Sequence, residues 1–172
     1  MKETGIIRRI DELGRIVIPK EIRKQMKINN GENIEIYISD DNIILKKYST
    51  VKNIEDFIQI LIDSIYTSCK FNIVVTDTSN IIAVSGISKK NVLGKEISND
   101  LINIIKNKKN IESNNLINVT ENLEISGNYK INLINVNGDI NGLIIFFGDK
   151  DINNNINLFN TASNFLSKYL EE

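Results

Sequence analysis

The sequence predicts a mixed fold of two domains, a small β-rich domain in residues 1–50 and an α+β domain with an antiparallel sheet in residues 51–172. Strand-like alternation of apolar residues, interrupted by one short basic helix, fills residues 4–48. Beyond residue 51 the strand patterns come in pairs joined by short turns, with helical apolar periodicity at both ends. A chain of 172 residues has room for one ordinary domain or two small ones.

The first domain is organised around residues 11–27, DELGRIVIPKEIRKQMK. Leu13, Gly14 and Arg15 predict a turn in which the glycine can adopt a positive φ. Residues 15–18 are β-branched enough for a brief strand, which Pro19 ends. Because proline is tolerated where a helix begins, we expect a helix over residues 20–26.

This helix separates its side chains into two faces. At 100° per residue Ile22 and Met26 lie opposite a basic stripe with i, i+3, i+4, i+7 spacing. The stripe consists of Lys20, Arg23, Lys24 and Lys27.

The rest of the first domain is expected to be strands, at residues 4–10, 33–39 and 43–48. So few residues cannot enclose a core unaided, and domains of this size usually need a metal, disulfides or a partner subunit. The segment contains no His and no Cys. We therefore expect an obligate, interwoven dimer.

The second domain is expected to follow a linker at residues 49–52, with Asn53 capping the first helix. Residues 107–128 are polar and rich in Asn, and no structure is assigned to them. The predicted helices cover residues 53–69, 98–106 and 154–170; the predicted hairpins pair residues 71–76 with 81–85 and residues 129–136 with 140–147. The first and last helices are candidates for a contact between copies, because both have wide apolar stripes.

Composition excludes several classes of function. With no His, one Cys and no Trp, the chain cannot build a zinc finger or a Ser-His-Asp or Cys-His catalytic site. Phosphate-binding glycine motifs and metal-ligand spacings are also absent, so we expect no enzyme activity, no metal and no cofactor. The lack of a long apolar run or a secretory leader predicts a cytoplasmic location without membrane contact.

Charge is distributed unevenly along the chain. The formal net charge is −1. Residues 1–27 have eight basic and four acidic residues, whereas residues 51–172 have eleven basic and fourteen acidic residues. This asymmetry indicates an anion-binding N-terminal domain on a weakly acidic body.

The run TGIIRRIDELGRIVIPKEIR resembles the AbrB-type swapped-hairpin family. The resemblance implies an intertwined dimer that binds double-stranded DNA through the first strand, the hinge and the helix. The positions that match are Arg8, Arg9, Arg15, Lys20, Arg23 and Lys24. Position 24 is often arginine in the family, and lysine lacks the planar fork of that side chain.

Residues 51–172 resemble a GAF domain, through IIAVSGISKKNVLGKEIS and NGDINGLIIFF. The pairing of the two domains is similar to transcription regulators of spore-forming bacteria. It implies a nucleoid-associated homotetramer, a dimer of dimers, that acts on sporulation-stage genes and has a GAF domain open to a small-molecule effector. Candidate ligand contacts are Ser88, Lys89 and Lys90, although such a cluster is more often an exposed loop. The effector and the sign of regulation stay open.

Two other functions remain possible for this chain. The same N-terminal domain occurs in antitoxins, which have a short disordered tail where this chain has a folded-looking domain. The second alternative is a pure nucleoid-packing protein. Footprinting separates the last case, because a regulator protects discrete promoters and a packing protein covers DNA uniformly.

Overall fold

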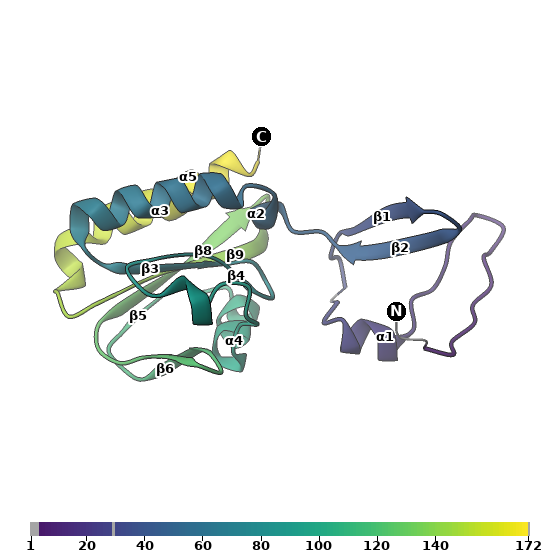
Figure 1. The fold of residues 1–172 in the computed structure, drawn as a ribbon, viewed down its shortest axis with the longest axis horizontal. Helices are drawn as coiled ribbons and strands as arrows, with labels where there is room; N and C mark the ends of the chain where they lie inside the picture. The colour runs from purple at the N-terminus through teal and green to yellow at the C-terminus, as the bar shows by residue number, and fades with distance from the viewer. Residues whose placement is uncertain (1–3, 29, 172) are drawn as a thin grey trace. The chain divides into compact units, whose positions relative to one another are not determined.

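The computed structural model describes residues 4–28 and 30–171 and divides the chain between Tyr48 and Ser49. The N-terminal unit contains one helix, α1 (Lys20–Gln25), and a hairpin of β1 (Ile34–Ser39) and β2 (Asn42–Lys47). The hairpin is antiparallel and in continuous register from Ile34↔Lys47 to Ser39↔Asn42. Figure 1 shows these elements at the purple and blue end of the chain. The predicted helix and hairpin are thus confirmed.

The strands predicted at residues 4–10 and 15–18 are not formed in the single chain. A strand needs a hydrogen-bonded neighbour, and β1 and β2 are paired with each other. Within this stretch, backbone hydrogen bonds are confined to the turn between Asp11 and Arg15. The alternation of apolar and polar residues over 4–10 therefore predicted a strand that one copy does not form.

The helix α1 ends one residue earlier than predicted, and this removes Lys27 from the basic stripe. Lys27 has φ 52°, a left-handed conformation. Its N–H donates to Lys24 O, and the N–H of Ile28 donates to Arg23 O, a Schellman arrangement that terminates the helix. The helical stripe therefore consists of Lys20, Arg23 and Lys24.

The N-terminal unit has almost no core of its own. Among residues 4–28 and 30–48, Pro19 is the only buried residue. Large apolar side chains are left in solvent, with Ile7 87% and Ile38 84% exposed. Exposed apolar surface of this extent on a small unit is typical of an interface that a partner subunit covers.

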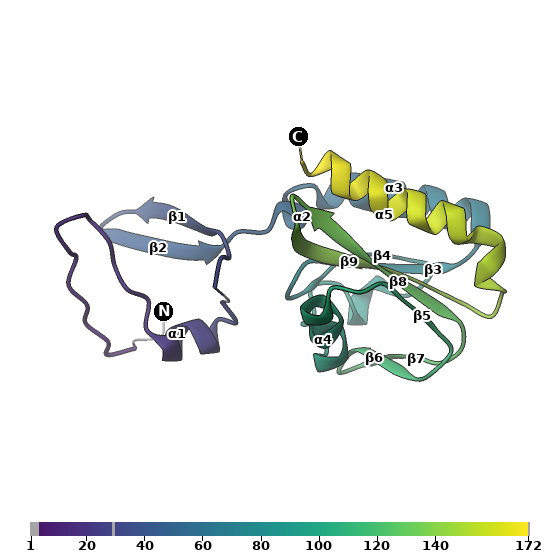
Figure 2. The same cartoon turned by 180° about the vertical axis from the view of Figure 1, so that it is seen from behind.

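The C-terminal unit is built on a five-stranded antiparallel sheet in the order β4-β3-β9-β8-β5. Figure 2 shows this sheet with helices on both of its faces. The strands are β3 (Asn72–Thr76), β4 (Ile81–Ser85), β5 (Ile111–Ser113), β8 (Tyr129–Val136) and β9 (Asp139–Phe147). Both predicted hairpins, β3–β4 and β8–β9, are confirmed.

Two apolar layers cover the two faces of the sheet. The helices α3 (Glu55–Cys69) and α5 (Ile156–Tyr169) lie side by side on one face, and α4 (Asn99–Asn107) with the hairpin of β6 (Ile117–Thr120) and β7 (Leu123–Ile125) covers the other. Alternate strand residues serve each layer: Ile73 and Val75 pack toward α3 and α5, and Val74 packs toward α4. Two short 3₁₀ turns, η1 (Lys89–Asn91) and η2 (Ile152–Asn155), complete the unit.

The predicted linker at residues 49–52 is wrong, because this segment forms a short helix, α2 (Thr50–Asn53). Ser49 Oγ accepts a hydrogen bond from Lys52 N at 3.2 Å and so caps it, and Val51 is fully buried in the C-terminal unit. Ile54, with φ −119°, then separates α2 from α3. Asn53 is therefore not the cap of the long helix.

Gly142, the fourth residue of β9, lies very close to the end of β3. A Cβ added at Gly142 would lie 2.0 Å from the carbonyl oxygen of Thr76. Only glycine allows two backbones to approach this closely. The register of β8 and β9 shifts at the same place, between Ile134 and Asn135.

Candidate nucleic-acid interface

The candidate interface begins with two arginines in the unpaired segment before α1. Arg8 and Arg9 are both exposed, and Arg8 Nη1 donates to Ile7 O at 2.9 Å. Because this segment is not a strand in the single chain, strand alternation does not fix the directions of these two side chains. Both guanidinium groups are accessible to an anion.

A tight turn fixes the third arginine. Gly14, with φ 74°, lets the chain reverse, and Gly14 N donates to Asp11 O at 2.9 Å. The Asp11 carboxylate accepts hydrogen bonds from Leu13 N at 3.0 Å, Arg15 N at 2.8 Å and Arg15 Nε at 2.7 Å. These contacts orient the guanidinium of Arg15 while its side chain stays 70% exposed.

The same contacts explain the acidity of Asp11. The hydrogen bond from the Arg15 backbone N–H, followed by the bond from its side chain, holds the pKa of the Asp11 carboxyl below its usual value. At neutral pH the carboxylate is therefore charged and ready to accept from both partners.

The helix α1 supplies the remaining predicted contacts. Lys20 and Lys24 are exposed and share one face, whereas Arg23 is half-buried beside them. Arg23 Nη1 donates to Asn30 Oδ1 at 2.9 Å, which ties the end of the helix to the segment before β1. Arg23 is thus held more firmly than its neighbours.

Together these elements place cationic side chains on an unpaired segment, a fixed turn and a helix that follow one another in the chain. The fork of a guanidinium can bind two acceptors of a phosphate or of a guanine edge, and an ammonium acts as a point charge. Such a set of side chains is suited to a polyanion with repeated phosphates. The residues concerned are Arg8, Arg9, Arg15, Lys20, Arg23 and Lys24.

Two supporting residues escaped the sequence analysis. Asp11 and Asn30 bind no anion themselves, but they hold Arg15 and Arg23. The four-residue spacing of Asp11 and Arg15 around a glycine was the available signal, since an Asp before a turn often accepts from backbone two residues on. Nothing in the sequence indicated the pairing of Asn30 with Arg23.

The candidate ligand loop of the second unit lies on the surface. Ser88, Lys89 and Lys90 are exposed around η1. Lys89 contributes to the electrostatics of Asp63, whose pKa is lowered first by the hydroxyl of Ser85, which donates to it at 2.6 Å, and further by Gln59 and the charge of Lys89. Lys89 therefore acts on Asp63 through its charge.

The described residues contain neither a candidate metal site nor a candidate membrane-spanning helix. Within residues 4–28 and 30–171 no group of three or more His, Cys, Asp or Glu side chains is positioned to hold a metal ion. Across the same residues no helix is long and apolar enough to span a bilayer.

Comparison with known families finds two matches that divide the chain close to its structural boundary. Residues 53–171 match a family described as "Stage V sporulation protein T C-terminal, transcription factor". Residues 7–53 match a family described as "Antidote-toxin recognition MazE, bacterial antitoxin".

Two relatives from Bacillus subtilis (strain 168) cover the chain to different extents. Stage V sporulation protein T is 36% identical over 180 residues, covering 100% of both chains. The transition state regulatory protein AbrB is 56% identical over 48 residues, which make up 28% of this chain and 50% of AbrB. The predicted AbrB-like N-terminal domain is thereby confirmed.

Among solved structures, the C-terminal unit is similar to the GAF domain of an Acinetobacter phosphoenolpyruvate-protein phosphotransferase. The TM-score is 0.57 at 11% identity, over 73% of this chain and 84% of that one. At this identity the likeness concerns the fold alone. It confirms the predicted GAF-like α+β fold with an antiparallel sheet.

Proposed function

This chain belongs to the stage V sporulation protein T family, and on that premise we propose that it regulates transcription of sporulation-stage genes by binding duplex DNA through its N-terminal unit. The observation that supports this proposal most is the set of accessible basic side chains on residues 8–9, the Asp11–Arg15 turn and α1. The chain acts in the cytoplasm, at the nucleoid, and is not an enzyme.

Dimerisation of the N-terminal unit is the first step of the proposed mechanism. Among the described residues of this unit, the apolar side chains of β1 and β2 are largely exposed, and residues 4–10 pair with no strand. A second copy of the same unit supplies both, a strand neighbour and an apolar surface, in an intertwined arrangement. The basic side chains of both copies then form one broad surface.

DNA affinity comes mainly from phosphate contacts. Lys20 and Lys24 neutralise phosphates and release their counterions, which gives binding with little dependence on sequence. Arg15 and Arg23 are held by Asp11 and Asn30, and an oriented guanidinium is suited to reading guanine in the major groove. We assign sequence preference to these two arginines.

Substitution of the two oriented arginines tests the proposal. We expect Arg15→Ala and Arg23→Ala each to weaken binding to a cognate promoter by about fivefold to 150-fold, since a good bidentate base contact contributes roughly 1–3 kcal/mol. Gel-shift titration measures the affinity, and size-exclusion chromatography checks that the oligomer is unchanged. The matched control is Lys106→Ala on α4 of the C-terminal unit, which should bind normally. Wild-type affinity in both arginine variants would contradict the assignment.

The family pairing further supports a homotetramer built as a dimer of dimers, with the GAF-like unit contributing the second contact. The GAF-like unit would then receive a small-molecule effector that changes DNA affinity. A thermal-shift screen of metabolites against the full chain tests the effector, and light scattering measures the mass of the assembly.

The match of residues 7–53 to an antitoxin family favours a second candidate, a protein that neutralises a toxin. The folded GAF-like unit in residues 49–171 argues for the regulator instead. Footprinting separates the regulator from a DNA-packing protein, because the regulator protects discrete promoters and the packing protein covers DNA uniformly. Rescue of growth by co-expression with a toxin would favour the antitoxin.

A further inference from the structure

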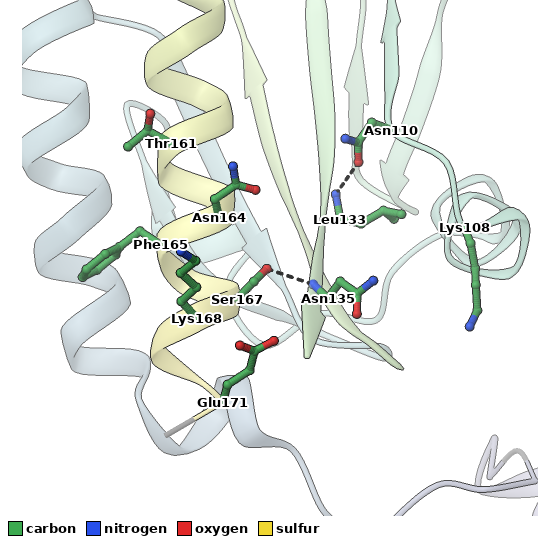
Figure 3. Close-up of a pocket in the computed structure, with 10 residues that line it drawn as sticks. All are labelled: Lys108, Asn110, Leu133, Asn135, Thr161, Asn164, Phe165, Ser167, Lys168 and Glu171. Carbon is green, nitrogen blue, oxygen red and sulfur yellow. Dashed lines mark hydrogen bonds between the residues drawn. The ribbon is translucent and has the colours of Figure 1, made fainter. Parts of the chain in front are cut away.

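An open groove lies between α5 and the outer edge of β8 in the C-terminal unit. Its volume is about 710 Å³, and Figure 3 shows side chains from α5 on one wall and from the end of α4 on the other. The polar residues on which the argument rests are Lys108, Asn110, Asn135, Ser167, Lys168 and Glu171. The predicted ligand loop at Ser88, Lys89 and Lys90 does not line this groove.

The groove exists because β5 is much shorter than β8. The pairing of the two strands stops at Ile111↔Ile131, while β8 continues to Val136. Beyond that point side chains take over the role of a neighbouring strand: Asn110 Oδ1 accepts from Leu133 N at 2.9 Å, and Ser167 Oγ accepts from Asn135 N at 3.0 Å. Both backbone N–H groups donate to acceptors on rotatable side chains, and an oxygen atom of a ligand can take the place of those acceptors.

Charges of both signs stand around these donors. Lys108 and Lys168 bring two ammonium groups to the groove, and Glu171 brings a carboxylate. All three side chains are exposed. A carboxylate on the ligand can therefore bind a lysine and a backbone N–H, and an ammonium group can bind Glu171 through a charge-assisted hydrogen bond.

We propose that this groove is the effector site of the GAF-like unit, and that its ligand is a small zwitterion with a carboxylate and an ammonium group, as in a free amino acid. The inference rests on the proposed function, since an effector needs a DNA-binding activity to modulate.

The same residues connect the groove to α2. Lys108 Nζ donates to Gly138 O at 3.2 Å and Glu171 Oε1 accepts from Asn137 N at 3.4 Å, so both charged groups hold the turn between β8 and β9. A few residues along β9, Asn141 Nδ2 donates to Thr50 Oγ1 in α2 at 2.7 Å.

A ligand that binds Lys108 or Glu171 breaks the hydrogen bond that this side chain makes with the turn between β8 and β9. Because β9 is bonded to α2, and only Ser49 separates α2 from the last residue of the N-terminal unit, the change reaches the DNA-binding unit through α2.

Ligand binding is tested with the full chain. The probes are the twenty free amino acids, each compared with the matched carboxylic acid that lacks the ammonium group and the matched amine that lacks the carboxylate, by ligand-observed NMR and calorimetry. We expect at least one amino acid to bind, its two analogues to bind at least about tenfold more weakly, and Lys168→Gln and Glu171→Gln to lose a similar factor. Lys90→Gln on the ligand loop is the matched control and should bind normally.

Coupling is tested by fluorescence anisotropy on promoter DNA with and without the bound amino acid. We expect the amino acid to shift DNA affinity several-fold in the wild type, and Thr50→Val and Asn141→Ala to bind the amino acid but lose the shift. Three results overturn the inference: no amino acid binds, binding survives both groove substitutions, or the ligand binds without changing DNA affinity. Failure of the ligand-free protein to bind DNA would instead contradict the proposed function, and calorimetry would still report on the site.

Discussion

At the scale of single residues, Asp11 shows how an acidic side chain can serve a basic surface. Its carboxylate lies next to Arg15 and reduces the local positive charge, yet it accepts three hydrogen bonds that fix the turn. A flexible arginine loses side-chain entropy when it binds DNA, and one that is already oriented loses less. Asp11 therefore contributes to recognition through the position of Arg15.

Because the pKa of Asp11 is lowered by folding, its stabilising contribution to the turn is present above the unfolded pKa, at pH above about 4, and disappears as the pH falls through the folded value. We expect NMR titration of the Asp11 carboxyl carbon to give a midpoint below that of an unstructured Asp. In Arg15→Ala the midpoint should rise only in part, because the backbone N–H of residue 15 still donates. An unshifted midpoint in the wild type would contradict these contacts.

Spacing and charge were sufficient to nominate the basic residues of the helix, and the resemblance to the AbrB-type family added the three arginines before it. The sequence could not show that Arg23 is half-buried and bonded to Asn30, since that contact joins the helix to a segment beyond its end. The helical spacing also placed Lys27 on the basic stripe of the helix, although α1 ends before this residue. Lysine gives no signal for the left-handed conformation that glycine usually adopts after a helix.

At the scale of elements, the helix caps decide which segments are regular. Ser98 Oγ accepts from Leu101 N at 3.3 Å and donates to Asn118 O at 2.5 Å, and so joins the start of α4 to β6. Ser88 occupies the equivalent position before η1, where its side chain makes no capping bond.

The two serines form a matched pair for a stability measurement. We expect Ser98→Ala to lower the free energy of unfolding of the C-terminal unit by about 1–2 kcal/mol, since the substitution removes a cap and a second hydrogen bond. Ser88→Ala should change it by less than about 0.5 kcal/mol, as exposed substitutions usually do. Urea denaturation followed by circular dichroism gives both values. Equal effects of the two substitutions would show that the cap contributes nothing.

In the C-terminal unit the longer elements were predictable, and the elements of three or four residues were not. The hairpins of the second unit and the helices α3 and α5 have enough residues for a clear period. Residues 107–128 contain β5, β6 and β7, which have only three or four residues each and whose pairing partners are distant or irregular. The helix α2 was missed because it depends on the burial of Val51 against the rest of the unit.

At the scale of the whole molecule, the two units differ in how they are stabilised. The C-terminal unit buries apolar residues on both faces of its sheet, whereas Pro19 is the only buried residue among residues 4–28 and 30–48. A unit whose apolar surface is covered only by a second copy is stabilised by association. Composition and length were enough to predict this difference, because both limit the size of a core.

Association of the N-terminal unit predicts a dependence of its stability on concentration. We expect hydrogen exchange at β1 and β2 to slow as the protein concentration rises through the dissociation constant of the dimer, while β3 in the C-terminal unit exchanges at a constant slow rate. Mass spectrometry of exchanged peptides measures both segments in one sample. Protection of β1 and β2 that stays constant on dilution to a proven monomer would contradict the need for a second copy.

The close approach of Gly142 in β9 to the end of β3 also limits which residues the gene can encode at this position. With the Thr76 oxygen only 2.0 Å from where a Cβ would stand, residue 142 should tolerate no side chain at all. At Gly138, with φ 91° and open space around it, the limit is conformational alone, so asparagine should survive there. In a saturation library selected for soluble full-length protein, codon 142 should therefore return almost nothing but glycine, while codon 138 returns a small, biased set.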